Sequence, residues 1–352
     1  MARLTALERT ALPLVSAATA LAGVANYAHW PPVPRFALAT VALAGLAWVV
    51  SFATEQLGER FGPAVTGMLQ STLGNLPELF VVVFALQKSE LVVAQTAIVG
   101  SIFANAMLVL GLVIVVGARR AEGGVMRFSH RLPRDTATLL LVTVFIIVLL
   151  GLSLAAHDPA SHHVQAISAV GAVSLLVVYL AWVVPYLRSD ATPDRAATRP
   201  RLALPVTLAL LGIGGAASAF VSDWFVAALA PAISQLHLSQ AFAGLVIVAI
   251  AGNAVENTAG IVLAYKRRSD LAISVVKNSV AQIAAFLFPV LVLISFALAT
   301  TLTFALAPVY IGALLVMALA MWQVTADGEA AEFEGWALVA LYVILATLAL
   351  YE

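Results

Sequence analysis

The sequence predicts an all-α protein that crosses a membrane about eleven times. Of its 352 residues, 62% are hydrophobic and only 10% are charged, whereas soluble domains carry roughly 25% charged residues. The cations gather in alternate loops between the apolar segments, and the pattern G-N-x-x-E occurs in the middle of two of these segments. Together these observations predict a polytopic membrane protein built from two related halves.

Eleven segments are long and apolar enough to cross a bilayer as helices, which takes about 20 residues each. The first is a membrane helix rather than a secretory signal, because residues 26–29 (NYAH) make a poor cleavage site. The apolar piece 223–237 contains Pro231, so we expect it to continue the seventh helix with a bend or to lie in the membrane interface. The predicted helices are 11–28, 36–56, 63–87, 90–117, 136–155, 164–187, 202–222, 239–265, 270–298, 302–324 and 333–351.

The cations test this helix count, because Lys and Arg are enriched in cytoplasmic loops. If successive helices alternate in direction, 15 of the 18 lysines and arginines fall on one side of the membrane. Only Arg35 and Lys88 fall on the other side, and Lys277 lies inside a helix. We therefore expect an integral protein of a bacterial inner membrane, with its N-terminus in the cytoplasm and its C-terminus outside.

The two copies of the G-N-x-x-E pattern end at Glu78 and Glu256, which are 178 positions apart. Each copy lies in the second helix of a predicted five-helix unit. Because five is odd, the second unit enters the membrane from the opposite side, which makes an inverted-topology repeat with both motifs near the midplane. The expected units are an N-terminal transmembrane helix (1–35), a first five-helix repeat (36–187), a cytoplasmic linker (188–201) and a second five-helix repeat (202–352).

Both motifs contain an acidic residue, and the first also has residues that break a helix. A carboxylate half way through the membrane is costly, so Glu78 and Glu256 are candidate functional residues. Pro77 has no N–H to donate to the carbonyl of Leu73, and Gly74 loosens the same turn. We therefore expect the helix to be kinked or broken there, which frees carbonyl oxygens to act as ligands.

Other polar side chains lie deep in the helices next to the motifs, where each needs an internal partner. Some of them can bond a neighbouring backbone instead of a ligand. Together they offer oxygen atoms, which suits hard cations such as Ca²⁺, and they include no His or Cys, which disfavours zinc, copper and iron. The set is Gln70, Ser71, Thr72, Asn75, Glu78, Ser101, Asn105, Asn253, Glu256, Asn257, Thr258, Lys277, Asn278, Ser279 and Gln282.

The sequence around these residues resembles the calcium/proton exchanger (CAX) family of the calcium:cation antiporter superfamily. Residues 73–79 (LGNLPEL) and 100–111 resemble the first α-repeat of that family, while 252–256 (GNAVE) and 264–293 resemble the second. The resemblance implies that Glu78 and Glu256 form the metal site and exchange the bound cation for protons. The residues that it implies along the site or its access paths are Asn75, Asn253, Ser101, Asn105, Ser279 and Gln282.

The second repeat departs from the family pattern at several positions, among them residues 278–282 (NSVAQ), where the family usually has Gly-Ser-Ser-x-Gln. Asn257 stands where the family commonly has His, and Lys277 stands where an apolar residue is expected. Lys277 either extends to the cytoplasmic surface or points at the site and pairs with a carboxylate, which favours a monovalent cation. The residues expected to modulate the site are Lys277, Asn257, Pro77, Gly74 and Gly252.

These features predict a secondary active antiporter that exchanges a cation, most readily Ca²⁺, for protons by alternating access. A Na⁺ or K⁺/proton antiporter of the same fold and a passive cation channel are the alternatives. An intramembrane hydrolase is disfavoured because the chain lacks H-E-x-x-H and any intramembrane Ser–His or paired-Asp arrangement. We expect no enzymatic activity and no resident cofactor. The expected partners are the cation, protons and the lipid bilayer, the zero net charge gives no sign of nucleic acid, and the oligomeric state stays open.

Overall fold

The computed structural model describes residues 5–58, 60, 72–129, 131–189 and 201–352, and most of them are helical. Several side chains inside helices, including that of Glu256, also lie outside the described part. The elements of the first half are α1 (Ala6–Tyr27), α2 (Pro32–Gly58), α4 (Leu76–Gln87), α5 (Leu91–Phe103), η1 (Ala104–Val109), α6 (Leu110–Arg120), η2 (Glu122–Gly124), β1 (Val125–Arg127), α7 (Arg131–Ala155), η3 (Pro159–His163) and α8 (Val164–Ser189).

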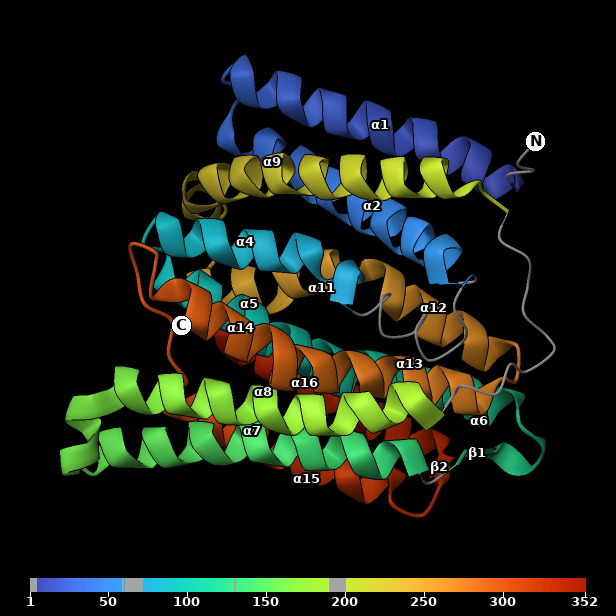
Figure 1. Ribbon diagram of the computed structural model, residues 1–352, viewed down its shortest axis with the longest axis vertical. Coiled ribbons are helices and arrows are strands. Elements are labelled where there is room, and N and C mark those ends of the chain that lie inside the picture. The colour runs from blue at the N-terminus through green and yellow to red at the C-terminus, as the bar shows by residue number, and fades with distance from the viewer. Residues whose placement is uncertain (1–4, 59, 61–71, 130, 190–200) are drawn as a thin grey trace.

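The second half follows the same plan of long apolar helices. Its elements are α9 (Leu204–Leu236), α10 (Gln240–Phe242), η4 (Ala243–Val248), α11 (Ala249–Gly252), α12 (Ala254–Tyr265), α13 (Ser269–Gln282), η5 (Ile283–Leu287), α14 (Phe288–Ser295), α15 (Pro308–Thr325), β2 (Glu329–Ala331) and α16 (Glu332–Leu350). Figure 1 shows α1, α2 and α9 along one edge of the molecule and α7, α8 and α15 along the opposite edge, with the remaining helices between them.

The helices agree with most of the predicted segments. Within the described residues, nine helices are long and apolar enough to span a membrane, and a bent pair over 240–265 makes a tenth. The predicted third helix, 63–87, is described from residue 72 onward, and α4 is its second part. The first two helices begin a few residues earlier than predicted, at Ala6 and Pro32.

The piece 223–237 continues the seventh helix, as the first of its two predicted alternatives had it, and does not lie apart in the interface. Helix α9 runs through Pro231 as one helix of 33 residues. One predicted boundary is corrected. The predicted helix 302–324 begins only at Pro308, whose missing N–H suits the first turn of a helix. The preceding residues form an extended segment that packs inside the protein, with Leu302 and Phe304 fully buried.

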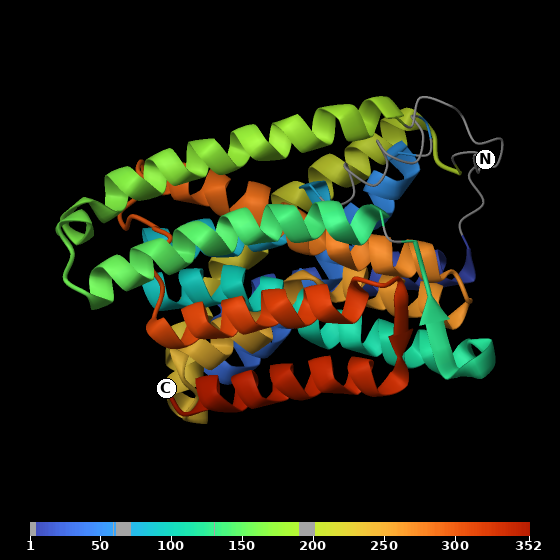
Figure 2. The ribbon, with the colours of Figure 1, turned by 90° about the horizontal axis from the view of Figure 1, so that it is seen from below.

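The chain is not entirely helical, because β1 and β2 form a small antiparallel sheet with Met126 opposite Ala330. Figure 2 shows this sheet at the end of the molecule that lies away from the C-terminus. One ion pair lies within the sheet, from Arg127 to Glu329 (3.1 Å), and another lies beside it, from Arg119 to Glu332 (2.6 Å). The sheet therefore joins the loop after α6 to the loop before α16, which sequence periodicity did not indicate.

The elements recur along the chain at the spacing of the two motifs. Both α4 and α12 have 12 residues, and α12 begins 178 positions after α4 (254 − 76). The same interval separates the starts of α6 and α14 (288 − 110). Helix α6 follows the π-helical segment η1, and helix α14 follows the π-helical segment η5. The local backbone is therefore repeated as well as the sequence motif.

Glycines allow the central helices to approach very closely. A Cβ atom placed on Gly100 would lie 2.5 Å from the Cα of Leu245, so α5 and η4 pack backbone against backbone. A Cβ atom on Gly111 of α6 would lie 2.6 Å from the carbonyl oxygen of Gly335 in α16. Such small residues are the usual means by which membrane helices come into contact.

Candidate functional site

Both motifs break their helix at the asparagine. Asn75 (φ −82°, ψ 4°) precedes α4 and Asn253 (φ −105°, ψ 13°) separates α11 from α12. These angles lie between the helical and extended regions, where many active-site residues are found. The second break bends the chain by 57°. The predicted break at the first motif is therefore confirmed, and an equivalent break occurs at the second.

The break places each glutamate in the first turn of the following helix. Glu78 is the third residue of α4, and Glu256 is the third residue of α12. The N-terminal end of a helix carries partial positive charge, which favours a carboxylate there. Glu78 is buried, with 1% of its surface exposed. The backbone thus holds the two glutamates at equivalent positions in the two halves.

The structure brings the two motifs together. A Cβ atom placed on Gly252 would lie 3.7 Å from the Cβ of Glu78. Asn253 donates from Nδ2 to the hydroxyl oxygen of Ser101 at 2.9 Å, in a bond that is fully buried. Ser101 belongs to the first half of the chain and Asn253 to the second, so each half contributes to one polar cluster.

Most of the remaining predicted residues that the structure describes are also buried. Asn105 donates to the carbonyl oxygen of Ser101 at 2.9 Å, so the predicted common face of these two residues is confirmed. Asn75, Ser279 and Gln282 are at most 4% exposed. Thr258, by contrast, is exposed, and its hydroxyl bonds the carbonyl of Ala254 in its own helix. Gln70 and Ser71 lie outside the described residues.

Several buried amide oxygens accept no hydrogen bond from the described part of the chain. Buried polar atoms in proteins nearly always have a partner, so such a group calls for a ligand or an ion. Amide and carboxylate oxygens are what hard cations bind. The oxygens concerned are Asn105 Oδ1, Asn253 Oδ1, Asn257 Oδ1, Asn278 Oδ1 and Gln282 Oε1. This donor set has the chemistry that a hard cation requires.

Lys277 does not extend to the surface, so that expectation was wrong. Its side chain is fully buried, and Nζ donates to the Thr325 hydroxyl on α15 at 2.5 Å. At 3.6 residues per turn, Lys277 lies about 200° around α13 from Ser279 and about 140° from Gln282. The ammonium therefore leaves α13 on the side that faces α15, away from the side that carries Ser279 and Gln282.

Three π-helical segments adjoin the polar cluster, and the sequence did not predict them. Such segments disturb the regular hydrogen-bond ladder and occur often at functional sites. Side chains from other helices take up two of their carbonyls: Thr143 bonds Ala284 O (3.2 Å) and Tyr342 bonds Leu245 O (3.4 Å). The cluster is thus held by neighbours far apart in the sequence.

Ser222 on α9 is a further contact that sequence reasoning missed. Its hydroxyl donates to the carbonyl oxygen of Pro77, within the first motif, at 3.4 Å. Gly214 and Gly215 lie two turns earlier on the same helix, and a Cβ on Gly215 would lie 3.8 Å from Leu76. Small and hydroxyl residues at helical spacing on α9 were the available signal, since they allow close approach in membranes.

Comparison with known proteins agrees with this architecture. A family model described as "Sodium/calcium exchanger protein" matches two stretches, residues 33–185 and 206–351. The chain is 31% identical over 335 residues to the "Vacuolar calcium ion transporter" of Schizosaccharomyces pombe, covering 92% of this chain and 80% of that protein. It is 28% identical to the "Ca(2+)/H(+) antiporter ChaA" of Bacillus subtilis, covering 95% and 96%.

Solved structures show the same fold. The structure of native YfkE superposes with a TM-score of 0.82 at 27% identity, covering 97% of this chain and all of that one. Both halves of the chain take part in this likeness, as they do in the match to the family model. The chain therefore belongs to the sodium/calcium exchanger protein family.

Proposed function

We propose that this chain is a secondary active antiporter that exchanges Ca²⁺ for protons at one site shared by its two halves. The observation that carries the proposal is the buried bond between Ser101 and Asn253, which joins the two polar segments into one cluster. The amide oxygens left without hydrogen bonds around it supply cation ligands. The relatives named as Ca²⁺/H⁺ antiporter and calcium ion transporter support calcium as the cation.

In this proposal the carboxylates of Glu78 and Glu256 bind the cation directly. Asn105, Asn253 and Gln282 complete the shell with amide oxygens, since Ca²⁺ takes about six to eight oxygen ligands in flexible geometry. Asn75, Ser101 and Ser279 orient these groups or line the path to them. The metal is cargo rather than a resident cofactor, and the protein needs none.

Exchange is obligatory because an empty, charged site is costly to enclose. Two ionised carboxylates enclosed in a covered interior carry a large desolvation penalty. A cation or protons neutralise them, so the site changes its exposure only when it is loaded or protonated. A cation that enters from one side displaces protons, and protons that enter from the other side displace the cation. The separate movement of either ion is thereby suppressed.

We also infer the inverted arrangement of the two halves. In Figure 1, α4 and α12 run from the middle of the molecule toward opposite ends, and the family model matches the chain twice. This supports eleven transmembrane helices: one in 1–35, five in 36–187, a linker 188–201 and five in 202–352. The cation asymmetry supports a cytoplasmic N-terminus, an external C-terminus and a location in a bacterial inner membrane.

A cation panel in sealed vesicles tests the proposed function. Purified protein is reconstituted, a pH gradient is imposed, and Ca²⁺, Na⁺, K⁺ or Mg²⁺ is added while internal pH is followed. We expect Ca²⁺ to collapse the gradient at lower concentration than the other ions. Collapse by Na⁺ or K⁺ alone would support the monovalent antiporter, and steady current without a pH gradient would support a channel. No response to any cation contradicts the proposal.

Lys277 gives a separate prediction on ion preference. Because its ammonium lies toward Thr325 and away from the Ser279 face, we expect Lys277→Leu to leave the Ca²⁺-to-Na⁺ preference within about twofold, as a side chain outside the binding shell adds little. Thr325→Val keeps the shape but removes a hydrogen-bond acceptor, and should destabilise the protein by about 1–3 kcal/mol in thermal unfolding.

Lys266→Leu is the matched control, because Lys266 is exposed at the end of α12. A strong shift of Lys277→Leu from Na⁺ toward Ca²⁺ would place the ammonium in the site. That result would favour the monovalent alternative for the unmodified chain.

A further inference from the structure

The site is covered by the pair of helices α2 and α9. Glu78 is almost fully buried, and α9 packs along α4, with Gly215 against Leu76 and Ser222 bonded to Pro77 O. On the other motif, α2 packs against α11 and α12. Among the described contacts, separating α9 from α4 or α2 from α12 would open a route to the site. These two contacts are the candidates for the two gates.

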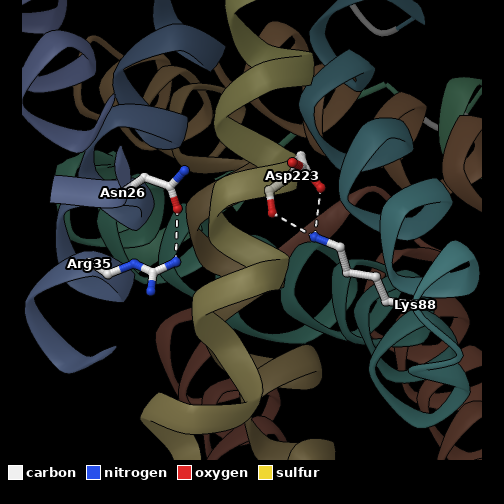
Figure 3. Close-up of polar contacts among 4 residues, drawn as sticks. All are labelled: Asn26, Arg35, Lys88 and Asp223. Carbon is white, nitrogen blue, oxygen red and sulfur yellow. Dashed lines mark hydrogen bonds and ion pairs between the residues drawn. The ribbon is translucent and has the colours of Figure 1, made fainter. Parts of the chain in front are cut away.

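Polar bonds hold the contact between α9 and α4. Lys88, which caps the end of α4, donates from Nζ to Asp223 Oδ1 at 2.6 Å and to the Asp223 carbonyl oxygen at 3.0 Å. Figure 3 shows the lysine reaching across to α9, where both oxygens face it. Ser222, the preceding residue on α9, bonds the first turn of α4. Ser222 and Asp223, two successive residues of α9, thus bond the first turn and the C-terminal end of α4.

The second half of the site has counterparts of these residues on α2. Glu55 precedes Pro63 by eight positions, as Asp223 precedes Pro231, and a hydroxyl residue stands directly before each carboxylate. On this spacing Glu55 corresponds to Asp223 and Thr54 to Ser222. Among its described contacts, Thr54 donates its hydroxyl to the carbonyl oxygen of Val50 in its own helix, at 2.8 Å.

The lysine itself is repeated, but among the described residues its ion pair is not. Lys88 corresponds to Lys266, which caps the end of α12 in the same way. Lys266 is exposed and makes no ion pair with any described residue. The helix-end cation and the carboxylate on the neighbouring helix are therefore common to both halves, whereas among the described residues the ion pair between them is formed in one.

We propose that Lys88, Asp223 and Ser222 form a latch that closes the α4–α9 gate and biases the empty protein toward access through the α2–α12 gate. The inference rests on the proposed exchange only in that access to the site must alternate. A ligand can shift such an equilibrium only through its different affinity for the two states. The latch therefore sets which face of the membrane the empty site meets first, independently of which cation binds.

Thiol labelling tests the latch directly, since the chain has no cysteine. Ser218 is buried on α9 one turn before Ser222, and its hydroxyl bonds only its own helix, at Gly214 O, among the contacts of the described residues. In full-length Ser218→Cys protein, a membrane-impermeant maleimide is applied to right-side-out and to inside-out vesicles, without added cation. Asp223→Asn and Lys88→Gln should raise labelling about two- to five-fold, as expected for one partly exposed ion pair.

The increase should occur from one face only, the face on which Lys88 lies. The exchanged pair Lys88→Asp with Asp223→Lys should return labelling toward the rate of the Ser218→Cys parent. Lys266→Gln and Arg35→Gln are matched controls. Lys266 corresponds to Lys88 in the second repeat. Arg35 is the other cation expected on the same side of the membrane as Lys88, and its guanidinium donates to Asn26 Oδ1 at 2.8 Å. Neither control should change the rate on that face.

Salt provides a measurement that needs no charge substitution. Screening weakens an exposed ion pair, so labelling of the Ser218→Cys parent should increase with salt, and labelling of its Asp223→Asn variant should not. Unchanged labelling in both single variants, equal increases from both faces, or no salt effect on the parent would overturn the latch. If no cation collapses the pH gradient but labelling rises from one face only, the proposed exchange is rejected and the latch is kept. If Ca²⁺ collapses the gradient but labelling does not rise from one face only, the latch alone is rejected.

Discussion

Glu78→Gln and Glu256→Gln are each expected to abolish cation-driven collapse of a pH gradient. Glutamine preserves the size of the side chain but cannot carry the charge that alternately binds a cation and a proton. Loss of an outer-shell partner lowers metal affinity by about 10–100-fold, so loss of a direct carboxylate ligand should exceed about 100-fold. The measurement is Ca²⁺-dependent proton movement in reconstituted vesicles.

Glu122→Gln is the matched control for this loss, because Glu122 is exposed in the loop after α6. It should exchange at the unmodified rate. The thermal unfolding of all three variants separates loss of function from loss of structure. Exchange at the unmodified rate in Glu78→Gln, with normal protein levels, would remove that carboxylate from the mechanism and contradict the proposed site.

Gly100→Ala is expected to damage both stability and exchange, although it adds one methyl group. The new Cβ would lie 2.5 Å from the Cα and 2.6 Å from the carbonyl oxygen of Leu245. Because these are backbone atoms, no side-chain rotation relieves the contact, and α5 must move away from η4. That movement also separates Ser101 from Asn253. Overpacking of this kind costs about 1–3 kcal/mol.

Gly212→Ala and Gly312→Ala are the matched controls, since a Cβ at either position meets open space. Alanine is the better helix former by about 1 kcal/mol, so these controls should be neutral or slightly stabilising. A loss of stability in Gly100→Ala, compared with neutral or raised stability in the two controls, is therefore attributable to the contact between α5 and η4. Thermal unfolding in detergent and Ca²⁺-dependent proton movement measure the two effects. Unchanged unfolding and unchanged exchange in Gly100→Ala would mean that this contact does not hold the site.

Local features of the sequence predicted the parts of the site that depend on one helix at a time. The depth of Glu78 followed from its place within an apolar segment, and the break at Asn75 followed from Pro77 and Gly74. The common face of Ser101 and Asn105 followed from their spacing. In each case the relevant distance spans one or two turns, so helical geometry and proline chemistry were sufficient.

Contacts between helices were beyond the reach of the same reasoning. The sequence showed Lys277 in a helix, but its burial depends on Thr325, 48 positions away on α15. The bond from Ser222 to Pro77 and the pair of β1 with β2 depend on which helices become neighbours. The π-helical segments also escaped prediction, because the side chains that take up their carbonyls come from other helices.

The sequence by itself determined the mostly helical membrane fold, the duplicated motif and the oxygen-bearing residues around that motif. Hydropathy, proline and charge act through local physical rules, and the interval of 178 residues is visible without coordinates. Only the tertiary structure decided how the two halves meet, which side of α13 carries Lys277, and that Asp223 binds Lys88 while Lys266 makes no such pair among the described residues. Those outcomes depend on close packing between distant helices, which a single sequence does not encode in any local pattern.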